Sequence, residues 1–537
     1  FAYSLFLCQN RIFQVDEAQT LDMAKVVGFG ETGEFFTTAA LSLLGPLAWI
    51  ASSDLSSGQV FAVSRLLFVG VFWYNVFLSA YLAGGSLTRV RGLLALLVAA
   101  SLAPLWDFGF EIRHDNLILA FVLTAFWMVR FRPIGKPSLV FSGAILASMP
   151  FIAFKAMVFA GPLFVLLLLM MVGQAREGGR RDWMLLLLGM LASGGAITGL
   201  YVLSGLWDVL LAGVTGGMDA SVMGRRFGIM DALKRAMVQC PLVGMATIVL
   251  APVEVVRWLR FPAGVLKALA QWPTLGLLVI GCFALGINPT PFPYNLVNVV
   301  PYAMIFVFGR IASHLESRIA PVGSAAILIF LVLMLHLLSF QGSVIRHLHW
   351  TNHRQRLLME TAESMSAKDH RVYDAVGMIL SRKSIDYNWY LHSLNMSAFA
   401  NGTLRVGEMV KAHPPVVIIP NYRTSWLPED DQVAMLSHHI PIADDFWVLG
   451  AWIESGSGDY EVLVGGRYAV FSTGEASADI RVDGLAIEPG VVFMEKGMHH
   501  LECQDGGALA IVWLGPDLDE IPYLGQQPET PLFVNWY

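Results

Sequence analysis

The feature that most restricts the fold of this chain is a series of long apolar runs in its first 340 residues. A bilayer-spanning helix needs about 20 consecutive apolar residues. Only 14% of the 537 residues are charged, whereas soluble domains carry about 25%. The sequence therefore predicts a polytopic α-helical membrane protein. The runs lie at residues 60–82, 93–106, 115–131, 138–153, 156–172, 183–206, 236–256, 268–286, 292–309 and 321–340.

Two further apolar segments complete the predicted membrane domain. Residues 1–8 are interpreted as the remainder of a first span, which brings the prediction to about 11 or more transmembrane helices. The run at residues 35–50 is interrupted by Gly45 and Pro46. This interruption favours a re-entrant or interfacial helix pair over a span.

Basic residues in alternate connections predict the orientation. If the spans are as described, all of these residues share one face, and the positive-inside rule makes that face cytoplasmic. The opposite, outer face then holds the segment around Asp16, the turn at residues 107–114, Lys155, the loop at residues 207–235 and everything after residue 340. We expect a multi-pass protein of the bacterial inner (plasma) membrane with an extracytoplasmic C-terminal domain. The basic residues are Arg89, Arg91, Arg130, Arg132, Lys136, Arg176, Arg180, Arg181, Arg257, Arg260, Lys267, Arg310 and Arg318.

The composition changes after the last apolar run, which predicts a boundary between residues 1–340 and residues 341–537. Residues 341–400 have the apolar spacing of an amphipathic helix, as at Val372, Ala375, Val376 and Ile379. Residues 414–537 contain short strand-like runs separated by Gly, Asp and Pro at about ten-residue spacing, which favours an antiparallel β-sandwich. The predicted strands lie at residues 416–419, 447–453, 460–464, 468–471, 479–482, 491–494, 499–503 and 509–514.

Ionisable side chains gather on the predicted outer face. A charged residue near the centre of a membrane helix costs roughly 2.5–3.5 kcal/mol, so such residues call for an explanation. The set contains carboxylates, which can accept a proton, and cations, which can hold a phosphate. A transfer reaction from a phosphate-linked donor needs this combination. Its members are Asp16, Glu17, Glu111, Arg113, His114, Asp115, Lys155, Arg225 and Arg226.

Four segments in this order resemble one family. Val15-Asp16-Glu17-Ala18 is similar to the acidic motif in the first outer loop of the GT-C glycosyltransferases, in the branch of the aminoarabinose transferases and protein O-mannosyltransferases. The segment from Glu111 to Asn116 resembles the E-x-R-x-D segment of that group. Lys155 lies in a turn that resembles "L-x-K-G", with Ala156 in place of the glycine. Tyr294, followed by Pro301, is similar to the late "Y-x-x-x-x-x-P" helix.

The resemblance, which covers residues 1–340, implies an activity. It implies transfer of a sugar, with inversion, from a polyprenyl-phosphate donor to the hydroxyl of a lipid, glycan or protein acceptor at the outer face. Asp16 would be the general base and Glu17 would shape the acceptor site. Arg113 and Lys155 would bind the lipid phosphate, and Asp115 would orient Arg113. The resemblance gives supporting places to Glu111, His114 and Tyr294, whereas Arg225 and Arg226 are added as phosphate ligands from their charge and placement alone.

Each site residue also has a plain structural interpretation. Asp16 and Glu17 can be solvated loop acids, and Arg113 with Asp115 can be an ion pair at a helix start. Lys155 can extend to the outer headgroups, and Arg225 with Arg226 can contact the same lipids. No cofactor and no metal site is predicted, although a pair of acids can also hold a divalent cation.

Two other functions remain as alternatives. A transporter or lipid-linked glycan flippase would distribute ionisable residues along its spans or relate them by an inverted repeat. A non-catalytic membrane anchor with a binding tail would leave the outer-face charges without a role. The net charge of −6 gives no indication of a nucleic-acid partner. Because the ionisable residues gather at one face, the sequence favours the transferase.

Overall fold

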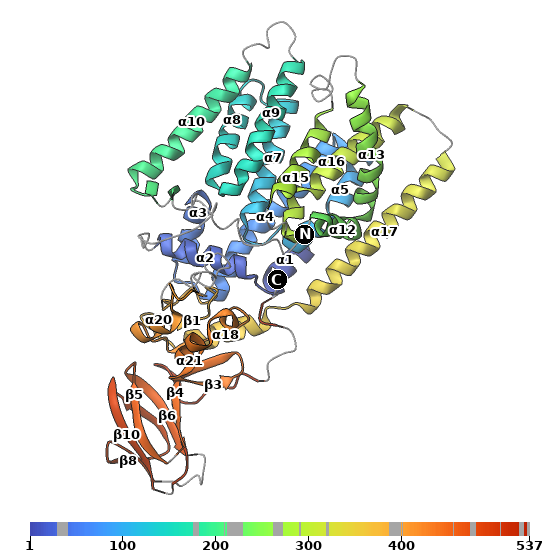
Figure 1. The fold of residues 1–537 in the computed structure, drawn as a ribbon. Coiled ribbons are helices and arrows are strands. Elements are labelled where there is room, and N and C mark those ends of the chain that lie inside the picture. Colours follow the sequence, from blue (N-terminus) through green and yellow to red (C-terminus); the bar gives the residue numbers. More distant parts are fainter. Residues whose placement is uncertain are drawn as a thin grey trace. The chain divides into compact units, whose positions relative to one another are not determined.

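The protein forms two compact units. One contains Phe1–Gln9, Gly30–Pro46 and Ser64–His349, and the other contains Asn10–Phe29, Leu47–Val63 and Trp350–Tyr537. Figure 1 follows the chain through both. The computed structural model describes residues 1–28, 41–174, 182–208, 210–211, 229–260, 272–288, 292–317, 322–385, 399, 401–454, 456–472, 479–504, 506–525 and 531–533.

The first unit is helical. Within the described residues, six helical segments are long and apolar enough to cross a membrane: Ser57–Gly84, His114–Phe131, Phe154–Val172, Asp182–Leu203, Pro241–Leu259 and Pro293–Ile311. Its elements are α5 (Val90–Ala99), α6 (Ala103–Phe108), α7 (His114–Phe131), α8 (Pro137–Ser148), η1 (Met149–Phe151), η2 (Phe154–Ala156), α9 (Met157–Gln174), α10 (Asp182–Leu203), α12 (Ile229–Gln239), α13 (Pro241–Leu259), α15 (Pro273–Ile287), η5 (Pro293–Asn298), α16 (Val300–Ser317) and α17 (Val322–His349). Three further helices belong partly to each unit: α1 (Ala2–Asn10), α3 (Leu41–Ala51) and α4 (Ser57–Gly84).

The membrane character predicted from the sequence is confirmed, but the count of 11 or more spans is not. Pro137–Phe151 and Pro273–Ile287 are apolar helices shorter than a full span. The predicted run at residues 93–106 is divided between α5 and α6, because the helix breaks at Ser101. The Ser101 hydroxyl lies within hydrogen-bond distance of the carbonyls of Leu97 and Val98, at 2.7 and 3.1 Å. Such local side-chain bonds to the backbone compete with continuation of the helix.

Small residues let helices of this unit approach closely, as is common in membrane proteins. A Cβ atom on Gly143 of α8 would lie 1.9 Å from the carbonyl oxygen of Leu186 in α10. A Cβ on Gly189 of α10 would lie 1.9 Å from the carbonyl oxygen of Val140 in α8. Any larger residue at Gly143 or Gly189 would therefore push these two helices apart.

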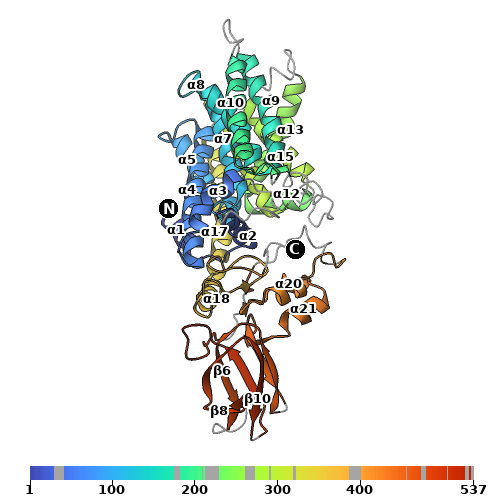
Figure 2. The same ribbon diagram turned by 90° about the vertical axis from the view of Figure 1, so that its left-hand side faces the viewer.

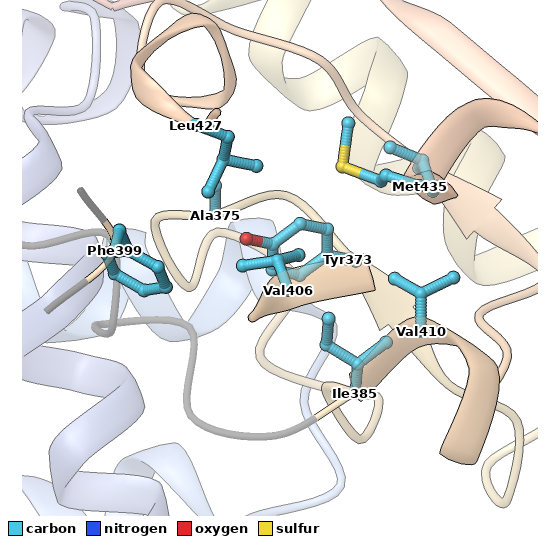
Figure 3. Packing of buried hydrophobic residues seen from close by; sticks show 9 residues of the cluster. Tyr373, Ala375, Ile385, Phe399, Val406, Val410, Leu427 and Met435 are labelled. Carbon is cyan, nitrogen blue, oxygen red and sulfur yellow. The ribbon is translucent and has the colours of Figure 1, made fainter. Parts of the chain in front are cut away.

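The second unit surrounds a small apolar core. Its helices are α2 (Val15–Gly28), α18 (His353–Ser364), α20 (Val406–Ala412), η8 (Thr424–Trp426) and α21 (Glu429–Leu436). Strands β1 (Val372–Tyr373) and β2 (Val417–Ile418) pair in parallel. Figure 3 shows Tyr373 at the centre of the cluster, with Val406 and Val410 of α20 and Met435 of α21 around it.

The predicted helical segment at residues 341–400 is only partly helical. α17 continues to His349 and α18 covers His353–Ser364, but Val372 lies in β1 and residues 374–379 form a loop. The Asp374 carboxylate accepts the backbone N–H groups of residues 376–379 at 2.7–2.9 Å. This loop buries Ala375, Val376 and Ile379, so their helix-like spacing comes from a turn that folds inward.

The predicted β-sandwich is present and has the strand order of a jelly roll. One sheet has the order β1-β2-β4-β11-β6-β9 with β3 beside β4, and the other has the order β5-β10-β7-β8. The eight strands from β4 to β11 thus have the order of that architecture, with β1, β2 and β3 added to one of its two sheets. Figure 2 shows this part with β6, β8 and β10 marked. The strands are β3 (His439–Ala443), β4 (Phe446–Ile453), β5 (Ser457–Val462), β6 (Gly466–Ser472), β7 (Ile480–Val482), β8 (Leu485–Ile487), β9 (Gly490–Met494), β10 (Gly497–Cys503) and β11 (Leu509–Trp513).

Candidate active site

The loop between α6 and α7 carries the first part of the candidate site, and it is fixed by an asparagine. Asn116, which is fully buried, donates hydrogen bonds to the carbonyls of Phe108 and Glu111, both at 2.9 Å. Its own carbonyl accepts a bond from Asn75 of α4 at 2.9 Å. The loop is therefore closed against the first turn of α7. Asp115 lies in that turn, where the helix dipole favours a negative charge.

Three charged side chains and one histidine meet around Asp115. One oxygen of Asp115, Oδ1, lies 2.8 Å from Nζ of Lys155. The other, Oδ2, lies 3.5 Å from Nε of Arg113 and 3.7 Å from Nε2 of His114. Glu111 Oε2 lies 3.9 Å from Nη1 of Arg113. The structure thus gathers residues that the sequence placed on one face, from the α6–α7 loop, from the first turn of α7 and from η2.

The aromatic ring of Tyr294 lies against both cations. The guanidinium carbon of Arg113 is 3.7 Å from the ring centroid, and Nζ of Lys155 is 5.2 Å from it. Phe292 stacks on the same ring with centroids 5.4 Å apart, and Phe108 approaches at 6.4 Å. Cations are attracted to aromatic faces within about 6 Å. The ring of Tyr294 therefore attracts both Arg113 and Lys155.

The two cations, Arg113 and Lys155, differ in how far they are exposed to solvent. Glu111, Asp115 and Arg113 are 0%, 2% and 6% exposed, whereas the side chain of Lys155 is 33% exposed. Arg113 lies between two carboxylates and a tyrosine ring, so its position is fixed from several sides. Lys155 is the most exposed member of the cluster, so an approaching anion can reach it.

The predicted acid pair belongs to the second unit. Asp16 and Glu17 occupy the first turn of α2, and Asp16 is half-buried. Glu17 is fully buried, and its Oε2 accepts the backbone N–H of Gln14 at 2.9 Å. This bond is the reciprocal half of a capping box, in which the third helical residue reaches back to the residue that precedes the helix. Glu17 thus stabilises the start of α2.

Two of the predicted residues and one predicted segment lie outside the described part of the chain. These are Arg225, Arg226 and residues 35–40, the first part of the predicted re-entrant or interfacial helix pair.

Sequence reasoning missed three neutral side chains that fix the site. Asn116 was not assigned a role, although a buried amide directly after Asp115 at a helix start is a recognisable signal. Asn298 of η5 donates to the backbone carbonyl of Asp115 at 3.2 Å. Phe292 supports Tyr294. Only tertiary structure brings Asn298 and Phe292 to α7, so no local pattern marks them.

A second buried polar group anchors α6, the helix that leads into the loop of the site. Asp107 of α6 lies with Oδ1 2.6 Å from Nε2 of His347 in α17. Its Oδ2 accepts a hydrogen bond from Gln239 of α12 at 2.8 Å. Asp107 thereby ties three helices of the first unit together, next to the residues that support the charged cluster.

The carboxylates of this cluster do not fit a divalent cation. Both oxygens of Asp115 face cationic groups, and Glu111 faces Arg113, so neither acid presents uncompensated charge. Among the residues that the structure describes, no three His, Cys, Asp or Glu side chains converge as a metal site.

Comparison with known proteins finds solved structures that share this architecture. No protein-family model matches the sequence, and no curated protein is significantly similar to it. Two crystal structures of ArnT from Cupriavidus metallidurans match with a TM-score of 0.53 and 13% sequence identity, one in the apo state and one bound to undecaprenyl phosphate. The match covers 83% of this chain and 95% or 96% of the ArnT chains. This chain has the fold of ArnT.

ArnT is an aminoarabinose transferase of the GT-C type. The resemblance found in the sequence is therefore confirmed for the fold. At 13% identity, the likeness to ArnT shows the fold alone, and the roles of individual residues stay predictions.

Proposed function

We propose that this protein is an integral membrane glycosyltransferase of GT-C type that uses a polyprenyl-phosphate sugar donor. The observation that carries the proposal is the fold of ArnT, one of whose structures contains undecaprenyl phosphate. The charged cluster of the first unit adds a chemical argument, since its accessible cation suits a phosphate ligand.

Lys155 and Arg113 are the proposed donor-phosphate ligands. The Lys155 ammonium is partly exposed and pairs with Asp115 at 2.8 Å, so it can exchange this carboxylate for a phosphate oxygen. Arg113 keeps its place through Tyr294 and Glu111 and supplies a fixed positive charge. Both charges would stabilise the phosphate as it leaves. Asp115 keeps the two cations in position between turnovers, and His114 lies beside it.

Asp16 is the proposed general base. The acceptor hydroxyl gives its proton to the Asp16 carboxylate while its oxygen forms a bond to the anomeric carbon of the sugar. The bond from that carbon to the phosphate oxygen breaks, and polyprenyl phosphate leaves with the electron pair. Attack from the side opposite to the phosphate inverts the anomeric centre. Base catalysis of this kind contributes about 10²–10⁴ in rate.

The proposed orientation follows from the charges of the loops. The connections rich in Arg and Lys face the cytoplasm, and the reaction takes place at the extracytoplasmic face of a bacterial inner membrane. Residues 341–537 then lie outside the cell membrane, with the acceptor arriving from that side. Cysteine labelling from the outside of intact cells, at residue 16 and at residue 523, where Tyr523 is 92% exposed, tests this orientation.

A transfer assay with a labelled polyprenyl-phosphate sugar tests the function. Asp16→Asn should abolish transfer and leave donor binding largely intact, whereas Lys155→Ala and Arg113→Ala should weaken donor binding. Lys234→Ala is the matched control, because Lys234 is 72% exposed and pairs only loosely with Asp231 at 3.9 Å. Full activity of Asp16→Asn would overturn the mechanism. Movement of intact donor across the membrane without cleavage would instead identify a flippase.

A further inference from the structure

The segment before α2 is bound to the start of the C-terminal region. Ile12 donates its backbone N–H to the carbonyl of Trp350, and Asn352 donates to the carbonyl of Asn10, both at 2.9 Å. Arg11 and Thr351 form an antiparallel bridge between these bonds. The chain therefore enters α2 along a short ladder made by residues more than 300 positions away.

Gln355 of α18 closes this ladder at the helix start. Its Oε1 accepts the backbone N–H of Phe13 at 2.7 Å, and its Nε2 donates to the carbonyl of Phe13 at 3.0 Å. The same Nε2 donates to the carbonyl of Leu532 at 2.8 Å. Gln355 is 1% exposed, so each of these bonds is shielded from water. One side chain thus binds both backbone groups of the residue just before the capping residue of α2.

The second half of α2 rests on the loop after β1. A Cβ atom on Gly377 would lie 2.6 Å from Cβ of Asp22, so only a glycine allows this approach. Lys25 donates a hydrogen bond to the carbonyl of Arg382. The loop itself is held by the four N–H groups that Asp374 accepts. α2 is therefore supported at both ends by the C-terminal region.

Asp16 lies between these two supports. Asp16 is the second residue of α2, which begins at Val15, and it follows Phe13 by three positions, so their Cα atoms are at most about 11 Å apart. A shift of Phe13 is passed directly to Asp16, because the capping bond between Gln14 and Glu17 makes the first turn rigid. A misplacement of about 1 Å in a catalytic group can lower a rate about 10²-fold.

We propose that Gln355 is a positioning residue that holds α2, and with it Asp16, in the reactive geometry. This inference rests on the proposed role of Asp16. It assigns the C-terminal region a part in the chemical step, in addition to any contact with the acceptor. Gln355 acts through the backbone of Phe13 and does not touch the substrate.

Gln355→Leu tests the proposal, because leucine has a side chain of similar size and cannot make any of the three hydrogen bonds. We expect kcat to fall about 10²-fold while the KM for the donor changes less than twofold. Gln355→Glu keeps an acceptor for the Phe13 N–H and should recover part of the rate. Gln432→Leu is the matched control: this half-buried glutamine donates to the carbonyl of Leu427 at 2.8 Å, away from α2. It should leave kcat unchanged.

Hydrogen exchange provides a readout that does not depend on activity. Gln355→Leu should accelerate amide exchange in α2, whereas Gln432→Leu should not. Unchanged exchange in α2 would overturn the positioning role whatever the rate. An equal loss of kcat in both variants would also overturn it, because the effect would then be general destabilisation. If amide exchange in α2 is faster in Gln355→Leu but the wild-type protein transfers no sugar, the proposed function is wrong. The result would still show that Gln355 stabilises α2.

Discussion

Two buried carboxylates, one in each unit, are satisfied in opposite ways. Asp115 and Asp374 are 2% and 1% exposed. Asp115 faces the side chains of Lys155, Arg113 and His114. Asp374 accepts four backbone N–H groups at 2.7–2.9 Å. A side chain can rotate away from its partner, whereas the backbone of a closed loop cannot.

The different partners of Asp115 and Asp374 suit two different uses of a buried carboxylate. The partners of Asp115 carry charge that another anion can take over, which suits a site that binds and releases a phosphate. The partners of Asp374 fix the path of the chain through Ala375 and Gly377, whose φ angles are 60° and 81°. The left-handed conformation of Ala375 costs roughly 1–2 kcal/mol, which the four hydrogen bonds offset.

Removing Asp374 should have the largest effect on stability. Asp374→Ala leaves four buried donors without an acceptor, at about 1–3 kcal/mol each. The sum reaches the whole stability of a typical domain, so we expect the second unit to unfold. Limited proteolysis and thermal unfolding measure this. Asp369→Ala, at an exposed position five residues earlier, should change the unfolding free energy by less than about 0.5 kcal/mol.

Removing Asp115 should cost about 3–5 kcal/mol, because it leaves a buried arginine and a lysine without their shared partner. If the comparison is right, inorganic phosphate should restore part of the melting temperature of Asp115→Ala and none of that of Asp374→Ala. Asp231→Ala, which removes a 64%-exposed acid of the same unit, serves as the control. Equal responses of both variants to phosphate would break the distinction between the two carboxylates.

Asp22 provides a pH test of the support of α2. Burial raises the pKa of Asp22 from 3.8 to about 6. The nearby charge of Lys25 lowers this pKa, and the charge of Asp374 raises it. Because the pKa of Asp22 is higher in the folded than in the unfolded protein, ionisation of Asp22 destabilises the folded state. This destabilisation is absent below pH 3.8, increases between pH 3.8 and pH 6, and is complete above pH 6. At about 1.4 kcal/mol per unit, Asp22→Asn should stabilise the second unit by up to about 3 kcal/mol at pH 8.

The advantage of Asp22→Asn should disappear below about pH 3.8, where Asp22 is protonated in the folded and in the unfolded protein. Thermal unfolding across this range measures the difference. A constant difference at all pH values would show that the substitution acts through packing. Asp369→Asn is the control for the loss of one acid.

The smallest effect is expected at Glu17. Glu17→Ala removes the acceptor of the Gln14 N–H and should lower stability by about 1 kcal/mol, whereas Glu17→Gln keeps an oxygen there and should be nearly neutral. Thermal unfolding tests both variants. If Glu17→Gln instead stopped transfer with unchanged stability, the carboxylate itself would take part in the reaction.

Local patterns predicted the parts of the fold that depend on nearest neighbours. The apolar runs gave the membrane helices, and alternation with turn residues gave most strands of the sandwich. The charges at Glu111, Arg113, Asp115 and Lys155 were placed together because each follows or precedes a span on the same predicted face. Pairing of the strands into a jelly roll was not predicted, since strand order depends on contacts that no local pattern specifies.

The misses have the same physical origin. Val372, Ala375, Val376 and Ile379 are spaced as on a helix, but the carboxylate of Asp374 binds the N–H groups that a helix would use. The placement of α2 with the C-terminal region depends on Gln355, which is 342 positions from Phe13. No sequence window is long enough to contain both partners.

The bond between Gln355 and Phe13 also sets an order of events during synthesis. At about 5–20 residues per second, the ribosome takes about 20–70 s to make the 342 positions that separate these residues. During this interval α2 exists without its support, and its buried face is available to chaperones or proteases. α2 is therefore synthesised early, but it reaches its final contacts only after Gln355 has been made. A chain that stops before Gln355 would carry α2 without the hydrogen bonds that Gln355 makes to Phe13.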